Sequence, residues 1–136
     1  ARHPGVRVVQ RPSASGQRAR AMAVMEDMVQ AHRSLKGVFA INDDSALGAL
    51  AVLDAAGRTD IVIVGFDATL EAQEAIRRGS ALKADIMQHP GEIGRTAIQV
   101  IARHLAGDAV EPIVSVPVNV VDATSLASAH GAGAAH

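Results

Sequence analysis

The sequence predicts an α/β fold: an open parallel sheet with helices on both faces, in the element order β-α-β-α-β-α-β-α-β. Short apolar runs alternate along the chain with segments of helical periodicity. The connections between them are short, which implies right-handed crossovers and parallel strands. One apolar run, residues 61–64, has no polar alternation, which is typical of a strand covered on both faces.

The N-terminal part of the chain is expected to supply two strands, each followed by a helix. Residues 6–9 are a short apolar run after a Pro-Gly turn and form the first predicted strand. Residues 17–32 repeat apolar side chains at helical spacing, so we expect an amphipathic helix with its methionines in the core. Residues 37–41 are the second strand. The helix predicted over 44–56 is apolar almost all round and should be buried, and Gly57 ends it.

The strand at 61–64 is followed by a helix over residues 71–78, which has acidic residues at its start and arginines at its end, as the helix dipole favours. Residues 82–87 form the next strand. The helix over 90–106 begins with Pro90 in its first turn. The N–H that a proline lacks would have no partner within the helix at this position.

The C-terminal region is expected to add one edge strand and a tail. Residues 113–121 are extended, and Pro117 confines them to an edge or a bend. Residues 122–136 are rich in alanine, glycine and serine and are expected to be a flexible tail. The folded domain is therefore expected to span residues 1–121.

Composition narrows the classes of function. The 136 residues are 49% apolar and 20% charged, which is typical of a single folded domain. Aromatic residues make up 1% and the net charge is −1, which argues against a nucleic-acid partner. There is no cysteine, which excludes a zinc thiolate site. No apolar run approaches the roughly 18 residues of a membrane span, and the sequence carries no recognisable signal peptide.

No catalytic or metal-binding pattern is found in the sequence. A Gly-x-Ser-x-Gly motif and a Gly-x-x-x-x-Gly-Lys phosphate loop are both absent. The six histidines are not paired at metal-ligand spacing on one helix face. Asp67 follows an aliphatic strand, as a receiver-type phosphoacceptor does, but no lysine follows a later strand. We therefore expect no enzymatic activity, no catalytic residue, no metal and no cofactor.

Polar side chains follow the second, third and fourth predicted strands at the point where each strand ends. These residues are Asn42, Asp67 with its neighbour Phe66, and Gln88. The carboxyl ends of parallel strands lie along one edge, where open α/β sheets bind ligands. Amide and carboxylate groups suit vicinal hydroxyls, and a phenylalanine ring suits the apolar face of a sugar. The alternative is that Asn42 and Asp67 only cap the helices that follow them.

Three blocks of sequence closely resemble the ribose-type periplasmic sugar-binding proteins of ABC transporters. They are Gly-Val-Phe-Ala-Ile-Asn-Asp-Asp-Ser-Ala-Leu-Gly-Ala-Leu at 37–50, Ile-Val-Ile-Val-Gly-Phe-Asp at 61–67 and Ala-Asp-Ile-Met-Gln-His-Pro at 84–90. The resemblance runs in order over residues 6–121. It implies half of a type I periplasmic-binding-protein fold, with a sugar cleft lined by Asn42, Phe66, Asp67 and Gln88.

The resemblance covers only the C-terminal of the two lobes found in that family. It implies that the first lobe is missing, as is the start of the second with its family arginine. In intact relatives the helix matching 90–106 packs on the first lobe, and residues 88–91 and the stretch around Asn119 are hinge segments. If the apolar stripe of the helix over 90–106 stays in water, the chain forfeits a hydrophobic stabilisation of about 25 cal/mol per Å². We expect this helix to pack on a second copy of the chain in a domain-swapped homodimer, or to fold back onto its own sheet.

The resemblance implies a non-catalytic solute-binding component of an ABC transporter, with a membrane permease as partner and a periplasmic or extracytoplasmic location. The implied ligand is a pentose or hexose, bound weakly by this chain alone because half of the cleft is missing. The alternative is the effector domain of a LacI-type repressor, which has the same fold and similar Asn-Asp and Gly-Phe-Asp blocks. Residues 76–80 and the block ending at Pro90 favour the transporter type.

Overall fold

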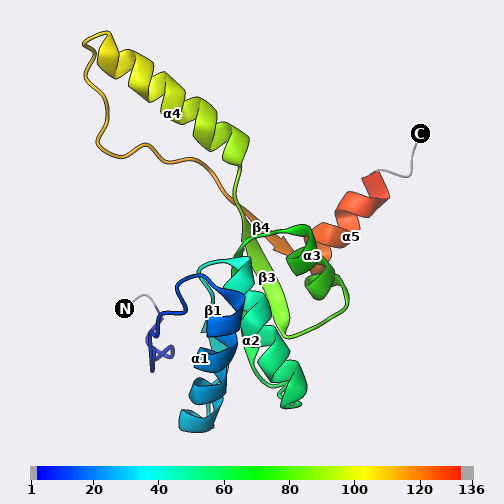
Figure 1. Ribbon diagram of the computed structural model, residues 1–136. Coiled ribbons are helices and arrows are strands. Elements are labelled where there is room, and N and C mark those ends of the chain that lie inside the picture. Colours follow the sequence, from blue (N-terminus) through cyan, green and yellow to red (C-terminus); the bar gives the residue numbers. More distant parts are fainter. Residues whose placement is uncertain (1–2, 133–136) are drawn as a thin grey trace.

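A four-stranded sheet lies at the centre of the computed structural model, which describes residues 3–132 (Figure 1). Its strands β1 (Gly37–Phe39), β2 (Val62–Asp67), β3 (Leu82–Met87) and β4 (Asn119–Asp122) are ordered β1-β2-β3-β4. The first three are parallel, which confirms the predicted α/β class. β4 is antiparallel to β3, because the chain leaves the sheet at the carboxyl end of β3 and returns at that same end.

Two helices, α1 (Arg18–Ala31) and α2 (Asp43–Ala55), pack on each other, and α2 packs on the sheet (Figure 1). α2 is buried along most of its length, as its apolar sequence predicts. Met25 and Leu53, each 1% exposed, fill the contact between the two helices and the sheet. At Gly48 the helices approach so closely that an added Cβ would lie 2.5 Å from the Arg18 carbonyl oxygen.

The remaining packed helices are α3 (Leu70–Arg77) and α5 (Ala123–Ala132), which contact each other beside β3 and β4. α5 corrects the expectation that only a tail follows residue 121; residues 133–136 lie outside the described residues. Asp122 caps this helix, because its Oδ1 accepts the Ser125 N–H at 2.8 Å and its own N–H donates to the Ser125 hydroxyl. Leu126 is 7% exposed and anchors the helix in the core.

Residues 6–9 form no strand, so the first predicted strand is wrong. Val6 and Val8 are 72% and 60% exposed, and the segment pairs with none of the four strands. A strand needs a ladder of hydrogen bonds to a neighbour, and an apolar run alone does not supply one.

Helix coverage of the two sheet faces is unequal. The helices cover the face on which Ile63, Leu82 and Val121 are buried. On the other face Phe39 and Val120 remain 65% and 60% exposed. The aliphatic run of β2 is therefore not covered on both faces as its composition predicts.

The helix α4 (Pro90–Leu105) projects away from the sheet, and no residue in it is buried (Figure 1). The alternative that it folds back onto its own sheet is therefore wrong. The segments that lead to and from it lie side by side, joined by a hydrogen bond between the His89 ring Nε2 and Asn119 Oδ1. None of the helices within residues 3–132 has the length and apolar character needed to cross a bilayer.

Candidate functional site

Asp67 and Gln88 meet at the carboxyl edge of the sheet. β2 and β3 pair with Asp67 opposite Met87, which places Gln88 beside the end of β2. Gln88 Nε2 donates a hydrogen bond of 2.6 Å to Asp67 Oδ1. The Asp67 side chain is exposed. Two of the predicted site residues thus form one polar unit that is open to a ligand.

Asn42 lies at the end of β1 and is the N-cap of α2. Its Oδ1 accepts the Ser45 N–H at 3.0 Å, and its Nδ2 donates to the Gly16 carbonyl at 3.0 Å. The capping alternative therefore holds for Asn42. It is wrong for Asp67, since Thr69 caps α3. Asn42 is partly exposed and its Nδ2 carries two hydrogens, so the bond to Gly16 leaves it one donor.

Phe66 is half-buried and stands opposite Ile86 in the ladder between β2 and β3. Strand alternation places its ring on the same face as Val64, which is the less covered face of the sheet.

The turn at residues 67–69 carries Asp67 and has an unusual backbone. Asp67 and Ala68 have φ angles of 122° and 56°, a region that residues with a Cβ adopt rarely. Two buried carboxyl groups hold the turn: Asp85 Oδ1 accepts the Ala68 N–H at 3.2 Å, and Asp43 Oδ2 accepts the Thr69 N–H at 2.6 Å. Strain of this kind persists only where the surroundings fix it.

Neither Asp43 nor Asp85 is among the ligand-binding residues that the sequence predicts. The available signal was an acidic residue inside the apolar strand Leu82–Met87. Burial raises the pKa of Asp85 to about 7, and the hydrogen bond and charge of neighbouring Asp43 act in the same direction. The raised pKa favours the protonated form of Asp85 in the pH range in which an ordinary aspartate is ionised.

A cluster of ion pairs joins three helices next to the carboxyl edge of the sheet. Arg18 of α1 donates two hydrogen bonds of 2.8 Å to Glu71 of α3 and pairs with Asp44 of α2 at 3.1 Å. The hydrogen bonds from Arg18 lower the pKa of Glu71 below its usual range. These ion pairs link the N-termini of α2 and α3, which follow the strands that end in the candidate site.

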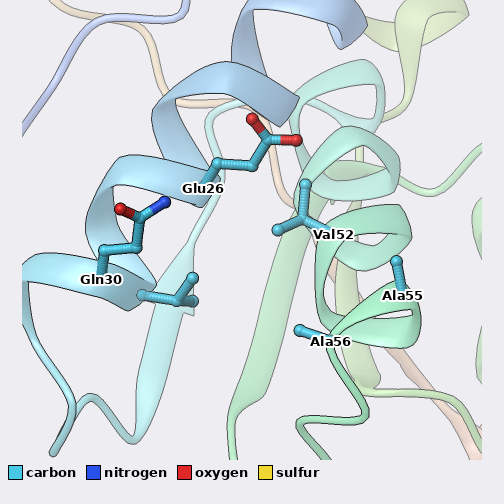
Figure 2. A pocket seen from close by; sticks show the side chains of 6 residues that line it. Glu26, Gln30, Val52, Ala55 and Ala56 are labelled. Atoms are coloured by element: carbon cyan, nitrogen blue, oxygen red, sulfur yellow. The ribbon is translucent and has the colours of Figure 1, made fainter.

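A separate hollow of about 310 Å³ lies between α1 and α2 (Figure 2). Its lining residues belong to the C-terminal halves of both helices and include Glu26, Gln30 and Val52. It therefore lies at the opposite end of α2 from Asn42. Among the described residues no group of three or more acidic, histidine or cysteine side chains is placed to hold a metal ion.

The mainly parallel sheet with polar groups at its strand ends defines an α/β domain of the class that binds ligands at the carboxyl edge. A family model described as the periplasmic binding protein domain matches residues 1–109. The chain belongs to this periplasmic binding protein family.

Individual relatives agree with the family match. The chain is 38% identical over 104 residues to the ribose import binding protein of Salmonella typhimurium, covering 76% of this chain and 35% of the relative. A solved ABC transporter solute-binding protein from Mycobacterium smegmatis with bound glycerol is 38% identical, with a TM-score of 0.78 over 92% of this chain and 43% of that one. A Bacillus halodurans solute-binding protein with bound myo-inositol is 30% identical, with a TM-score of 0.76 over 96% of this chain and 45% of that one.

The curated relative is an import binding protein and the two solved structures are ABC transporter solute-binding proteins, a non-catalytic class. This favours the transporter type over the LacI-type repressor. The chain spans about a third of the length of the curated relative and under half of each solved structure.

Proposed function

We propose that this chain recognises a monosaccharide or related polyol, without catalysis, as part of the solute-binding protein of an ABC importer. The observation that carries this proposal is the Gln88–Asp67 hydrogen bond at the carboxyl edge of the sheet, in a chain of this family. The partners are the sugar and a membrane permease, and the location is the periplasm or another extracytoplasmic space. Ribose, glycerol and myo-inositol, the ligands named for the relatives, all present neighbouring hydroxyl groups.

The polar unit suits this chemistry. The Asp67 carboxylate accepts hydrogen bonds from hydroxyls, while the remaining Asn42 amide hydrogen donates to a hydroxyl oxygen. Charge-assisted bonds to Asp67 are the strongest of these contacts. We assign Phe66 the apolar contact with the ligand. Because Asp67 is exposed, a ligand held here stays in contact with water, and binding by this chain alone is weak.

An NMR titration of the ¹⁵N-labelled chain with D-ribose, myo-inositol and glycerol tests the site. We expect shift changes around residues 42, 67 and 88, with a dissociation constant on the order of 1 mM for the preferred ligand. Asp67→Ala should weaken that binding at least about tenfold, because a charge-assisted bond is lost. Glu74→Gln on the exposed surface of α3 is the matched control and should leave it unchanged. Absence of any shift at 100 mM sugar would overturn the proposed site, and sub-micromolar binding would contradict its openness.

We also propose that the protein is a homodimer in which α4 packs on a second copy. Ile101 and Leu105 on this helix are 53% and 80% exposed, so its apolar side chains lack a partner within the described chain. Burying them stabilises an assembly by about 25 cal/mol per Å². The exposed position of α4, away from the sheet, suits exchange between identical subunits (Figure 1).

Sedimentation velocity at micromolar concentration tests the dimer. We expect the wild-type chain to sediment as a dimer and Ile101→Glu to shift it to monomer, because a charge in an apolar contact is costly to bury. Gln99→Glu, an exposed polar position of the same helix, is the control and should remain dimeric. A wild-type monomer at these concentrations would rule out the exchanged dimer.

A further inference from the structure

Asp43 and Asp85 form a buried carboxyl pair beneath the candidate site. Asp43 stands in the first turn of α2 and Asp85 in the middle of β3, and the two residues are 3% and 0% exposed. They meet over Gly65 of β2, where an added Cβ would lie 3.1 Å from Asp43 Oδ1 and 3.0 Å from Asp85 Cγ. Only a glycine at this position leaves room for both carboxyl groups.

One oxygen of each carboxyl group has no hydrogen-bond partner elsewhere in the described part of the chain. These atoms are Asp43 Oδ1 and Asp85 Oδ2, the two that face the Gly65 position. Two buried carboxylates that face one position are disfavoured as a doubly ionised pair, because burial and like charge both oppose the second charge. A single proton shared between the facing oxygens satisfies both atoms, and it belongs to the pair rather than to one residue.

The other oxygens of the pair hold the strained turn. Asp85 Oδ1 binds the Ala68 N–H and Asp43 Oδ2 binds the Thr69 N–H, the two amides directly after Asp67. Asp67 itself has a φ of 122° and contacts Gln88 from this conformation. The separation of the two carboxyl groups therefore sets where the turn and the Asp67 side chain lie.

We infer that Asp43 and Asp85 are positioning residues for ligand binding: their shared proton keeps the turn at residues 67–69 in the binding conformation. Loss of that proton to solvent leaves two like charges facing each other, which separates α2 from β3 and displaces the turn. Polyol affinity then falls as the pH rises through neutrality. The affinity consequence rests on the proposed function, whereas the proton-dependent turn does not.

Other charged or titratable groups on the surrounding elements are more exposed than the pair. Arg18 of α1 is already paired with Asp44 and Glu71, so it is not the counterion of either buried carboxyl. His89 directly follows Gln88, which bonds Asp67, so its signals are followed separately from those of the pair. Charged or titratable side chains of the surrounding elements include Arg18, Asp44, Asp67, Glu71, His89 and Asp122.

NMR of the ¹⁵N,¹³C-labelled chain between pH 5 and 9 tests the turn. In the wild type we expect the Asp85 carboxyl carbon and the Ala68 and Thr69 amides to titrate together. Asp85→Asn keeps the acceptor for Ala68 and supplies a fixed donor toward Asp43, so both amides should stay constant over this pH range. Glu74→Gln should titrate like the wild type. Asp43→Asn is the second variant and should behave as Asp85→Asn does.

Binding of D-ribose and myo-inositol at pH 6 and pH 8 tests the consequence. We expect the wild-type affinity for the preferred ligand to fall about tenfold at pH 8, because the binding conformation needs a proton that is mostly lost one pH unit above a pKa of about 7. The affinity of Asp85→Asn should differ less than twofold between pH 6 and pH 8.

Two NMR outcomes overturn the inference. Either the Ala68 and Thr69 amide shifts do not change with pH in the wild type, or they titrate equally in the wild type and in Asp85→Asn. Equal pH dependence of binding in wild type and Asp85→Asn also overturns it while leaving sugar recognition intact. A titrating turn without polyol binding at either pH refutes the proposed function and not the turn.

Discussion

Replacing Gly48 with alanine is expected to lower the free energy of unfolding by about 1–3 kcal/mol, the range for overpacking a close contact. The new methyl group would lie 2.5 Å from the Arg18 carbonyl oxygen and 3.0 Å from Ala21 Cβ. Since the nearest atom belongs to the backbone of α1, no side chain can turn away to make room. The whole helix must move, which opens the contact that contains Met25 and Leu53.

Urea unfolding followed by circular dichroism measures this change. Gly94→Ala is the matched control, because Gly94 is also inside a helix but has no atom within 4 Å of an added Cβ. Alanine favours a helix over glycine by roughly 1 kcal/mol, so this control should not be destabilised. A Gly48→Ala protein as stable as the wild type would show that α1 and α2 separate at little cost.

Element positions could be predicted from the sequence where a local signal marks each end. Gly57, Gly79 and Gly107 all have positive φ angles directly after α2, α3 and α4, as the capping pattern requires. Pro90 begins α4 at the predicted residue. These signals act within a few residues, so no knowledge of the packed structure was needed.

The wrongly predicted elements are those whose structure depends on residues far away in the sequence. Residues 6–9 have strand-like composition, but strand formation depends on a neighbouring strand that local sequence does not reveal. α5 lacks a clear apolar stripe and is fixed instead by the Asp122 cap and by one side chain, Leu126, in the core. The direction of β4 depends on the path of the chain through α4.

The same distinction applies to the candidate site. Strand-end position was sufficient to predict that Asp67 and Gln88 lie close together. The Asp43–Asp85 pair could not be predicted, because 42 residues separate its members and only the crossing of α2 over β2 and β3 at Gly65 brings them together. An acid inside an apolar strand shows that a partner is needed but does not identify it.

The stability of the wild-type protein is expected to fall by about 2–3 kcal/mol between pH 5 and pH 8, through the titration of Asp85. The pKa of this carboxyl is about 7 in the folded protein, against an ordinary value of 3.8. Between these values the folded state holds a proton that the unfolded chain has released. The folded state therefore binds more protons than the unfolded state, and raising the pH favours unfolding.

Urea unfolding at pH 5, 6, 7 and 8 measures this slope, with Asp85→Asn and Glu74→Gln as the comparison pair. The slope should disappear in Asp85→Asn, which has no proton to lose there, and persist in Glu74→Gln. Exposed carboxyl groups with lowered pKa values, such as Glu71 and Asp122, act in the opposite direction, because their contribution is lost as the pH falls through the acidic range. Parallel stability curves for wild type and Asp85→Asn would mean that the buried pair remains ionised when folded, and that another group fixes the turn beneath Asp67.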